Sequence, residues 1–314
     1  MTAYIIRRLV LMIPVALLVT IIVFALVRIT PGDPALVYLG ETATPEAVAA
    51  VHHQLGLDQP MPVQYAIFLG NLLHGNLGFS LQTHEPVLGA ILGRFPATAE
   101  LGLTALAFAL VVALPAGMVS ALRRGSLAGA VAGSVPILGV SLPTFFLGII
   151  LILLFALYLR IFPPGGFTSF TEDPGSNIRH LILPAITLGT GSAAINLRLM
   201  RSSLLETLSA DYIRTARSKG LGRWLVTSRH ALRNALIPVV TVIGLQVGLL
   251  LEGAFVTETI FAWPGIGRLA VNGIFERDYP VVQGVVLFAA FVYMFASLLV
   301  DVSYVYLDRR ISYS

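Results

Sequence analysis

The stretch Asp211–Pro238, DYIRTARSKGLGRWLVTSRHALRNALIP, is a basic passage between two apolar segments. It holds five Arg and Lys219, whereas His180–Leu197 before it and Asn234–Leu251 around its end contain no Asp, Glu, Lys or Arg. A helix needs about 20 mostly apolar residues to cross the hydrocarbon core of a bilayer. The pattern therefore predicts a polar connection between two membrane-spanning helices.

The composition of the whole chain agrees with a membrane protein. Of 314 residues, 56% are hydrophobic and only 11% are charged, whereas soluble domains have roughly 25% charged residues. The sequence pI near 9.6 would suggest nucleic acid in a soluble protein, but here the basic residues mark membrane orientation and predict no nucleic-acid partner. The absence of cysteine excludes disulfides and thiolate metal sites.

Uncharged windows of spanning length recur along the chain and predict an all-α, polytopic membrane protein with six transmembrane helices. The expected spans are Leu9–Val27, Leu101–Leu122, Val135–Tyr158, His180–Leu197, Asn234–Leu251 and Val281–Val300. The first is longer than the apolar region of a signal peptide, which has 7–15 residues. We therefore interpret it as a retained span.

Arginine and lysine predict the orientation, because cytoplasmic loops are enriched in them. With six spans, the basic-rich side holds Arg7, Arg8, Arg123, Arg124, Arg201, Arg214, Arg217, Lys219, Arg223, Arg229, Arg233, Arg309 and Arg310. The opposite side holds Arg94, Arg160, Arg179, Arg268 and Arg277. Both termini and the basic passage are therefore expected in the cytoplasm.

Two outer segments carry local structure signals. Thr44 is the expected N-cap of a short helix that begins at Pro45, and Val63–Leu73 is expected to form a second helix. Trp263, Pro264 and Gly265 form a tight turn with an aromatic anchor. That turn predicts a gating or partner-docking role, and an interfacial belt aromatic is the alternative for Trp263.

The chain lacks the motifs of energy-converting and hydrolytic enzymes. Lys219 lies between Ser218 and Gly220, so the Gly-Lys-Ser/Thr of a nucleotide-binding P-loop is absent. The histidines form no H-E-x-x-H pattern, and no G-x-S-x-G is present. We therefore expect no catalytic residues, no metal site and no cofactor in this chain.

Polar residues inside the expected spans are candidates for a transport pathway. Glu252 and Asp301 are carboxylates, which are costly in a membrane and tend to mark a water-filled path. Both can instead reach water at a span end or pair with a basic group. Gln246 is a further pathway candidate, and Asn196 and Gln246 can also act as polar contacts between helices.

The basic passage itself predicts two helices that lie under the membrane. On one helix, an apolar stripe of residues recurs at three- and four-residue spacings: Leu204, Leu205, Leu208, Tyr212, Ile213 and Ala216. Gly220 and Gly222 are expected to end it. A second periodic run contains Trp224, Leu225, Ser228, Ala231 and Leu232. Docking to a protein through Ala216-x-x-x-Gly220, binding of anionic lipid and simple positive-inside charge remain alternatives.

The passage resembles the coupling-helix motif of the permease subunits of ABC importers, in the dipeptide/oligopeptide/nickel branch. The general motif is Glu-Ala-Ala with a Gly four residues later, and this chain has Arg214, Thr215, Ala216 and Gly220 at these places. RITPGDPA, LGLDQPMPVQY, GNLGFS, RFPATAELGL, SLPTFFLG and FAWPGIGRL…RDYPVVQG are also similar to this branch. One departure is Asp308-Arg309-Arg310, where the family usually has Asp-Pro-Arg.

The resemblance implies a domain layout and a set of partners. It implies a first helix in 1–29, an extracytoplasmic insertion in 30–97, and a type 1 membrane domain in 94–307, with spans near 98–122, 135–158, 180–200, 235–257 and 281–306 and coupling helices in 203–232. The implied partners are a second homologous permease, two ATPase subunits that bind ATP and Mg, and an extracytoplasmic solute-binding protein. The implied location is the prokaryotic inner membrane.

The resemblance also implies site residues and a substrate class. Those expected to contact an ATPase are Asp211, Tyr212, Arg214, Thr215, Ala216, Arg217, Lys219 and Gly220. Peptides are the expected substrate, while nickel chelates, glutathione and sugars are alternatives within the branch. An ion-coupled carrier that titrates Glu252 and a non-transporting scaffold are the competing classes. The carrier class usually has an internal repeat, which we do not find between the two halves.

Overall fold

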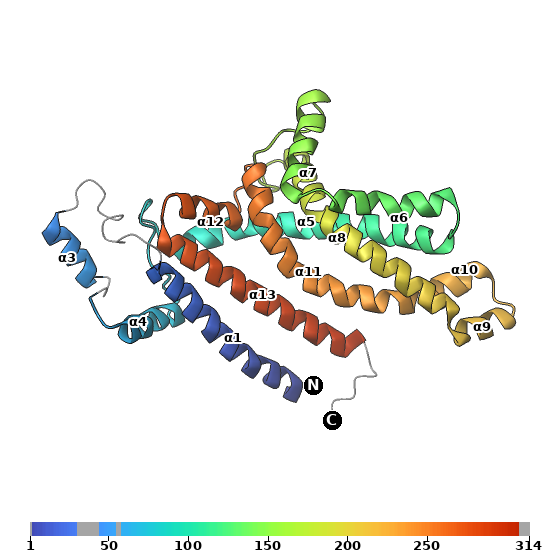
Figure 1. Ribbon diagram of the computed structural model, residues 1–314, viewed down its shortest axis with the longest axis horizontal. Coiled ribbons are helices and arrows are strands. Elements are labelled where there is room, and N and C mark those ends of the chain that lie inside the picture. The colour runs from blue at the N-terminus through green and yellow to red at the C-terminus, as the bar shows by residue number, and fades with distance from the viewer. Residues whose placement is uncertain (1, 30–43, 55–57, 308–314) are drawn as a thin grey trace. The chain divides into compact units, whose positions relative to one another are not determined.

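The computed structural model describes residues 2–29, 44–54 and 58–307 of the chain, and these residues form helices and connecting turns. In chain order the helices are α1 Thr2–Ile29, α3 Pro45–Gln54, α4 Met61–Leu73, α5 Val87–Leu122, α6 Leu127–Val140, α7 Thr144–Leu151, α8 Pro174–Ser209, α9 Asp211–Ser218, α10 Arg223–Leu225, α11 Leu232–Ile260, α12 Ile266–Phe275 and α13 Tyr279–Leu307 (Figure 1). Two π-helical turns, η2 Ile152–Tyr158 and η3 Val226–Ala231, follow α7 and precede α11. The sequence motifs at 30–43, 55–57 and 308–314 lie outside the described residues.

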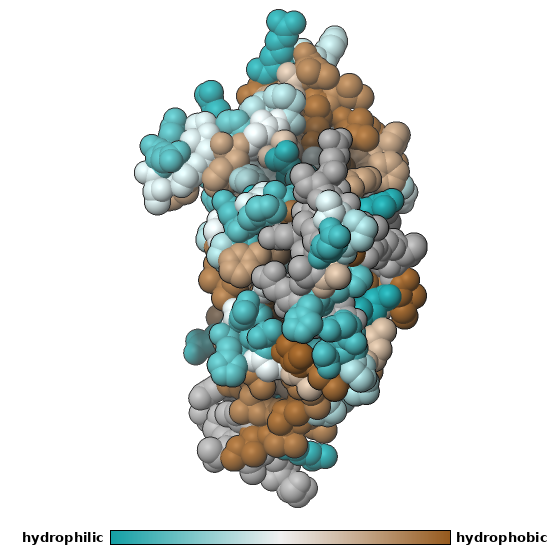
Figure 2. All heavy atoms as spheres, turned by 90° about the vertical axis from the view of Figure 1, so that its left-hand side faces the viewer, coloured by the Kyte–Doolittle hydropathy of each residue, from teal (hydrophilic) through white to brown (hydrophobic). Residues whose placement is uncertain are grey.

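Among the described residues, four helices are long and apolar enough to cross a membrane: Ile6–Ile29, Val87–Leu122, Pro174–Ser209 and Tyr279–Val300. A fifth candidate is the pair Arg223–Gln246 and Leu250–Ile260, which is bent by 56°. Apolar side chains lie open on the surface, as expected for a chain whose solvent is lipid (Figure 2). The prediction of an all-α, multi-pass membrane protein is therefore confirmed, whereas the six-helix count and the cytoplasmic position of both termini stay predictions.

The expected third span, Val135–Tyr158, is not a single helix, and this prediction was wrong. The chain breaks after α6, and α7 begins at Thr144 after an extended Pro143 with φ −55° and ψ 141°. Proline disfavours the helical conformation of the residue before it, here Leu142. The apolar window therefore divides into α6 and the segment α7–η2, each shorter than the spanning helices.

The chain divides into two compact units. Unit 1 comprises Met1–Pro96 and Pro264–Phe295, and unit 2 comprises Ala97–Trp263 and Ala296–Ser314. In unit 1, α4 packs on α1 through Tyr65, whose ring lies 5.4 Å from that of Phe24 and whose hydroxyl lies 2.8 Å from the Thr20 hydroxyl. The insertion after the first span is thus anchored to that span by aromatic and polar contacts.

Two turns in unit 1 are fixed by polar groups. Asp278 is buried at the start of α13, and its carboxylate accepts a 2.5 Å hydrogen bond from the Ser80 hydroxyl. The Ser80 hydroxyl oxygen in turn accepts from the Thr83 amide. In the same insertion, α3 begins at Pro45, as the Thr44-Pro45 signal predicted, and α4 begins two residues before the expected Val63.

In unit 2, α8 is the central helix, with α6, α7 and α11 packed against it. Close approach depends on small residues, as is common between membrane helices. A Cβ atom at Gly189 of α8 would collide with the backbone oxygen of Ala105 in α5. One cluster of buried side chains joins α5, α8 and the second half of α11: Ala97, Leu101, Ala105, Leu181, Ala185, Leu188, Leu250, Ala254 and Trp263.

Candidate functional site

The basic passage forms a compact helical corner at the ends of α8 and α11 (Figure 1). α8 ends at Ser209, Ala210 is extended with φ −68° and ψ 149°, and α9 begins at Asp211. The prediction of one continuous helix through Leu204 and Ala216 was therefore wrong. The break agrees with the acidic Asp211 in the first turn of α9, where it complements the helix dipole.

α9 has one buried face and one exposed face. Ile213 is completely buried and Ala216 is 8% exposed, and both belong to a second apolar cluster in unit 2. The other buried members of this cluster are Ala121, Met200, Leu204, Val226, Ala231, Ala235 and Val239. Ala216, which the resemblance implied as a partner contact, thus packs inside its own chain.

The remaining predicted coupling residues lie on the open side of α9 and its end. Asp211, Tyr212, Arg214, Thr215, Arg217, Lys219 and Gly220 are all exposed. The phenolic oxygen of Tyr212 accepts a 2.9 Å hydrogen bond from Asn234 of α11, so Tyr212 also joins the two helices. The structure therefore offers a polar surface on α9 that is held by an apolar base.

Gly220 ends α9 in the left-handed region, with φ +80°. Its amide donates to the carbonyl of Arg217 at 2.9 Å, and no atom lies within 4 Å of a Cβ built at this position. A residue with a side chain would be strained here because of the backbone and not because of crowding. The prediction that Gly220 ends this helix is confirmed, whereas Gly222 is extended and precedes α10.

The second periodic run has a different buried face from the one expected. Trp224 and Leu225 are 77% and 41% exposed, while Val226 and Ala231 are buried. The buried positions are five residues apart because η3 is a π-helical turn, which adds a residue to the turn and shifts the faces that follow. The predicted 3.6-residue period ignored that extra residue.

Most charged side chains of this helical corner are exposed and can contact a partner. The ion pair that the structure describes here joins Arg214 to Asp211 at 3.6 Å, and both side chains are at least 79% exposed. Exposed pairs of this kind contribute little to stability. In the described part of the chain, no group of three His, Cys, Asp or Glu residues is placed to hold a metal ion.

The structure places two of the predicted pathway residues, Gln246 and Glu252, in different environments. Gln246 is buried, and its side-chain oxygen accepts a 2.8 Å hydrogen bond from Asn196 of α8. Glu252 is exposed on α11. Gln246 is thus placed as a contact between two helices, whereas Glu252 faces the outside of unit 2.

The predicted turn at Trp263 is built into the core. Trp263 is completely buried, its indole N–H donates to the Ala97 carbonyl at 2.8 Å, and Phe167 packs edge-on at 4.8 Å. This burial argues against an interfacial belt position for Trp263. Gly265 is the extended residue at the start of α12, directly after Pro264.

A buried carboxylate, Glu258, was missed by the sequence reasoning. It is completely buried in the last turns of α11 and accepts a 2.6 Å hydrogen bond from the Thr98 hydroxyl of α5. The expected span in this region ended at Leu251, or near residue 257, before Glu258. The signal was present, because Leu250, Ala254 and Glu258 recur every four residues on one face and the first two are buried.

The long apolar helices and the polar helical corner define a multi-pass membrane protein. The chain belongs to the family described as binding-protein-dependent transport system inner membrane component, whose model matches residues 113–313. The N-terminal model of the same transport systems matches residues 1–102. The chain is therefore an inner-membrane component of a transport system that depends on a binding protein.

Relatives resemble this chain over its whole length. A protein named di/tripeptide transport system permease protein DppB, from Pseudomonas aeruginosa, is 47% identical, with 99% of each chain covered. The dipeptide transport system permease protein DppB of Escherichia coli K12 is 43% identical, again with 99% of each chain covered. A putative peptide transport system permease protein of Brucella abortus is 44% identical, with 100% of each chain covered.

Proposed function

We propose that this chain is one permease subunit of an ATP-driven importer of di- or oligopeptides. The family assignment supports transport, and the full-length relatives bearing dipeptide and di/tripeptide names support peptides over nickel chelates, glutathione or sugars. In this proposal, an extracytoplasmic binding protein delivers the solute. A second, homologous permease completes the channel.

ATP hydrolysis belongs to separate subunits in this proposal, and α9 is the element that meets one of them. The observation that carries the assignment is the division of α9 into two faces. Ile213 and Ala216 are fixed in the apolar cluster, while Arg214, Arg217 and Lys219 point outward. A contact on the outer face would thus act on a rigid base instead of a mobile loop.

The base of α9 offers a route for movement. The same apolar cluster contains Leu204 of α8 and Ala235 of α11, so a displacement of α9 would be transmitted to both long helices. Coupling of this kind requires an element with two arrangements whose equilibrium a remote site can bias. We assign that role to the α8–α9–α11 corner, which would switch the channel between inward-open and outward-open states.

The test is to replace Gly220 by Leu in the assembled transporter, with Gly222→Leu as the matched control. A Cβ at either glycine meets no atom within 4 Å, but only Gly220 has a positive φ. We expect Gly220→Leu to lower ATP-driven peptide uptake in proteoliposomes while the ATPase subunits still hydrolyse ATP. The control should retain uptake.

Two results would contradict the proposal. Equal uptake by Gly220→Leu and the unmodified transporter would remove α9 from the coupling route. Peptide uptake by the chain alone, driven by an ion gradient without ATPase subunits, would instead support a secondary carrier.

A further inference from the structure

The segment that leads into α11 carries an exposed stripe on the side opposite its buried face. Leu225, Arg229, Arg233 and Ile237 recur every four residues, and all four are exposed. Behind them, Val226, Ala231, Ala235 and Val239 are buried in the apolar cluster. The stripe is therefore the outer face of a helix that is fixed from behind.

The stripe changes from basic to apolar as α11 enters its candidate span. Beyond Arg233, Ile237, Val240 and Leu245 are 44%, 37% and 55% exposed, and they lie in the first part of the bent span Arg223–Gln246. Four helical residues rise about 6 Å. Arg233 thus lies about one turn, and Arg229 about two turns, before the first of these apolar residues.

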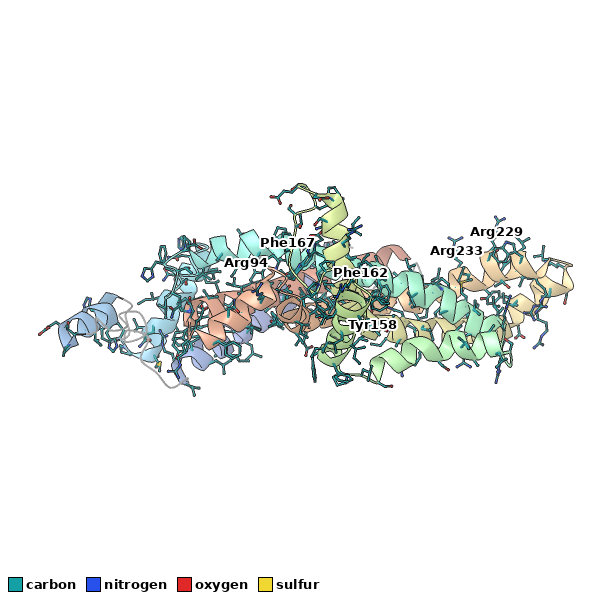
Figure 3. All side chains as sticks on the ribbon, turned by 90° about the horizontal axis from the view of Figure 1, so that it is seen from above. Arg94, Tyr158, Phe162, Phe167, Arg229 and Arg233 are labelled. Carbon is teal, nitrogen blue, oxygen red and sulfur yellow. The ribbon has the colours of Figure 1, made fainter. Side chains whose placement is uncertain are left out.

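Both arginines are available to an anion. Within the described residues, no carboxylate pairs with Arg229 or Arg233, and both side chains extend away from the helix on its open side (Figure 3). Side chains four residues apart on a helix are neighbours, with about 5–6 Å between their Cβ atoms. The planar guanidinium group also matches the geometry of phosphate oxygens.

We propose that Arg229 and Arg233 bind the phosphate of an anionic phospholipid in the leaflet that α11 enters. A phospholipid fits both the arginine pair and the apolar residues beyond it, because its phosphate contacts Arg229 and Arg233 while its acyl chain covers Ile237 and Val240. Anionic lipid attracts basic groups close to a membrane end. This site lies on a different helix from the polar face of α9, and it requires only that α11 spans the bilayer.

The test uses the absence of native cysteine. A fluorophore is attached to Val240→Cys in the full transporter, which is placed in phosphatidylcholine bilayers. Spin-labelled phosphatidylglycerol quenches the fluorophore when this lipid lies next to residue 240. We expect phosphatidylglycerol to be enriched there over spin-labelled phosphatidylcholine. Arg229→Gln with Arg233→Gln should weaken the preference roughly twenty-five-fold, because each arginine near an anionic surface contributes roughly five-fold.

The matched control is Arg123→Gln with Arg124→Gln, an exposed arginine pair in the turn after α5. It removes the same charge and should leave the preference unchanged. If the control loses the preference for phosphatidylglycerol to the same extent, the preference comes from diffuse electrostatic attraction. That result would overturn the proposed lipid site. Loss of an ATPase subunit from the Arg229/Arg233 variant, with unchanged lipid quenching, would also overturn it and assign the pair to a protein contact.

Discussion

At the scale of single residues, the buried polar groups of unit 2 stand out. Glu258 has the Thr98 hydroxyl as a hydrogen-bond partner, and Asn196 is bonded to Gln246. Burying a carboxylate is costly unless it is hydrogen-bonded, so the Thr98 hydroxyl stabilises the position of Glu258. These contacts join α5 to α11 and α8 to α11 inside an otherwise apolar interior.

Replacing Thr98 by Val should destabilise the protein by about 1–3 kcal/mol, because the buried Glu258 carboxylate then lacks this donor. Thr98→Ser retains the hydroxyl and serves as the control for loss of the methyl group. The free energy of unfolding, measured by denaturant titration in detergent micelles, distinguishes them. Equal losses in the two variants would mean that the hydrogen bond contributes nothing.

At the scale of helices, close contact between backbones determines the packing of α5 against α8. Gly189 faces the Ala105 carbonyl and the ring of Phe108, and a backbone carbonyl cannot move aside as a side chain can. The neighbouring Gly191 has open space around it. The two glycines of the same helix therefore have different roles.

Gly189→Ala should separate α5 from α8 and cost at least about 1–3 kcal/mol of stability, as overpacking does. Gly191→Ala should cost nothing, because its Cβ meets no atom. Thermal unfolding of both variants in the same detergent provides the comparison. A Gly189→Ala variant as stable as Gly191→Ala would contradict the close contact between the two helices.

Sequence patterns predicted the long helices well and the irregular turns poorly. The apolar windows within α1, α5, α8 and α13 are long and uniform, so period and composition were sufficient. The break at Pro143, the new helix at Asp211 and the π turn η3 each depend on one or two residues within a continuing pattern. Which face became buried then depended on tertiary packing.

The residues of the candidate site also divide into those that the sequence patterns predicted and those that they did not. Gly220 was predictable because the end of a helix requires a left-handed residue. The burial of Ala216 agrees with its place in the predicted apolar stripe, but the stripe did not show whether Ala216 would pack within its own chain or in a partner's groove. Glu258 was missed because the expected span was ended too early, although its apolar face continued.

At the scale of the whole molecule, the orientation of the chain in the membrane is a prediction of its basic residues. The absence of cysteine makes it testable with single thiols. Ser218→Cys in α9 should react with an impermeant maleimide only after the cells are opened, because α9 is expected in the cytoplasm. Glu172→Cys, exposed before α8, should react in intact cells, and the reverse pattern would contradict the orientation.

The measurement that tests the central claim most directly is the reactivity of Ser218→Cys with and without the ATPase subunits. Ser218 is exposed on α9, and Arg124→Cys, in the exposed turn after α5, is the control. If α9 is the coupling element, assembly with the ATPase subunits should protect Ser218→Cys but not Arg124→Cys, and the protection should change when ATP is added. Equal labelling of Ser218→Cys in the free and assembled protein, at every nucleotide state, would contradict the account.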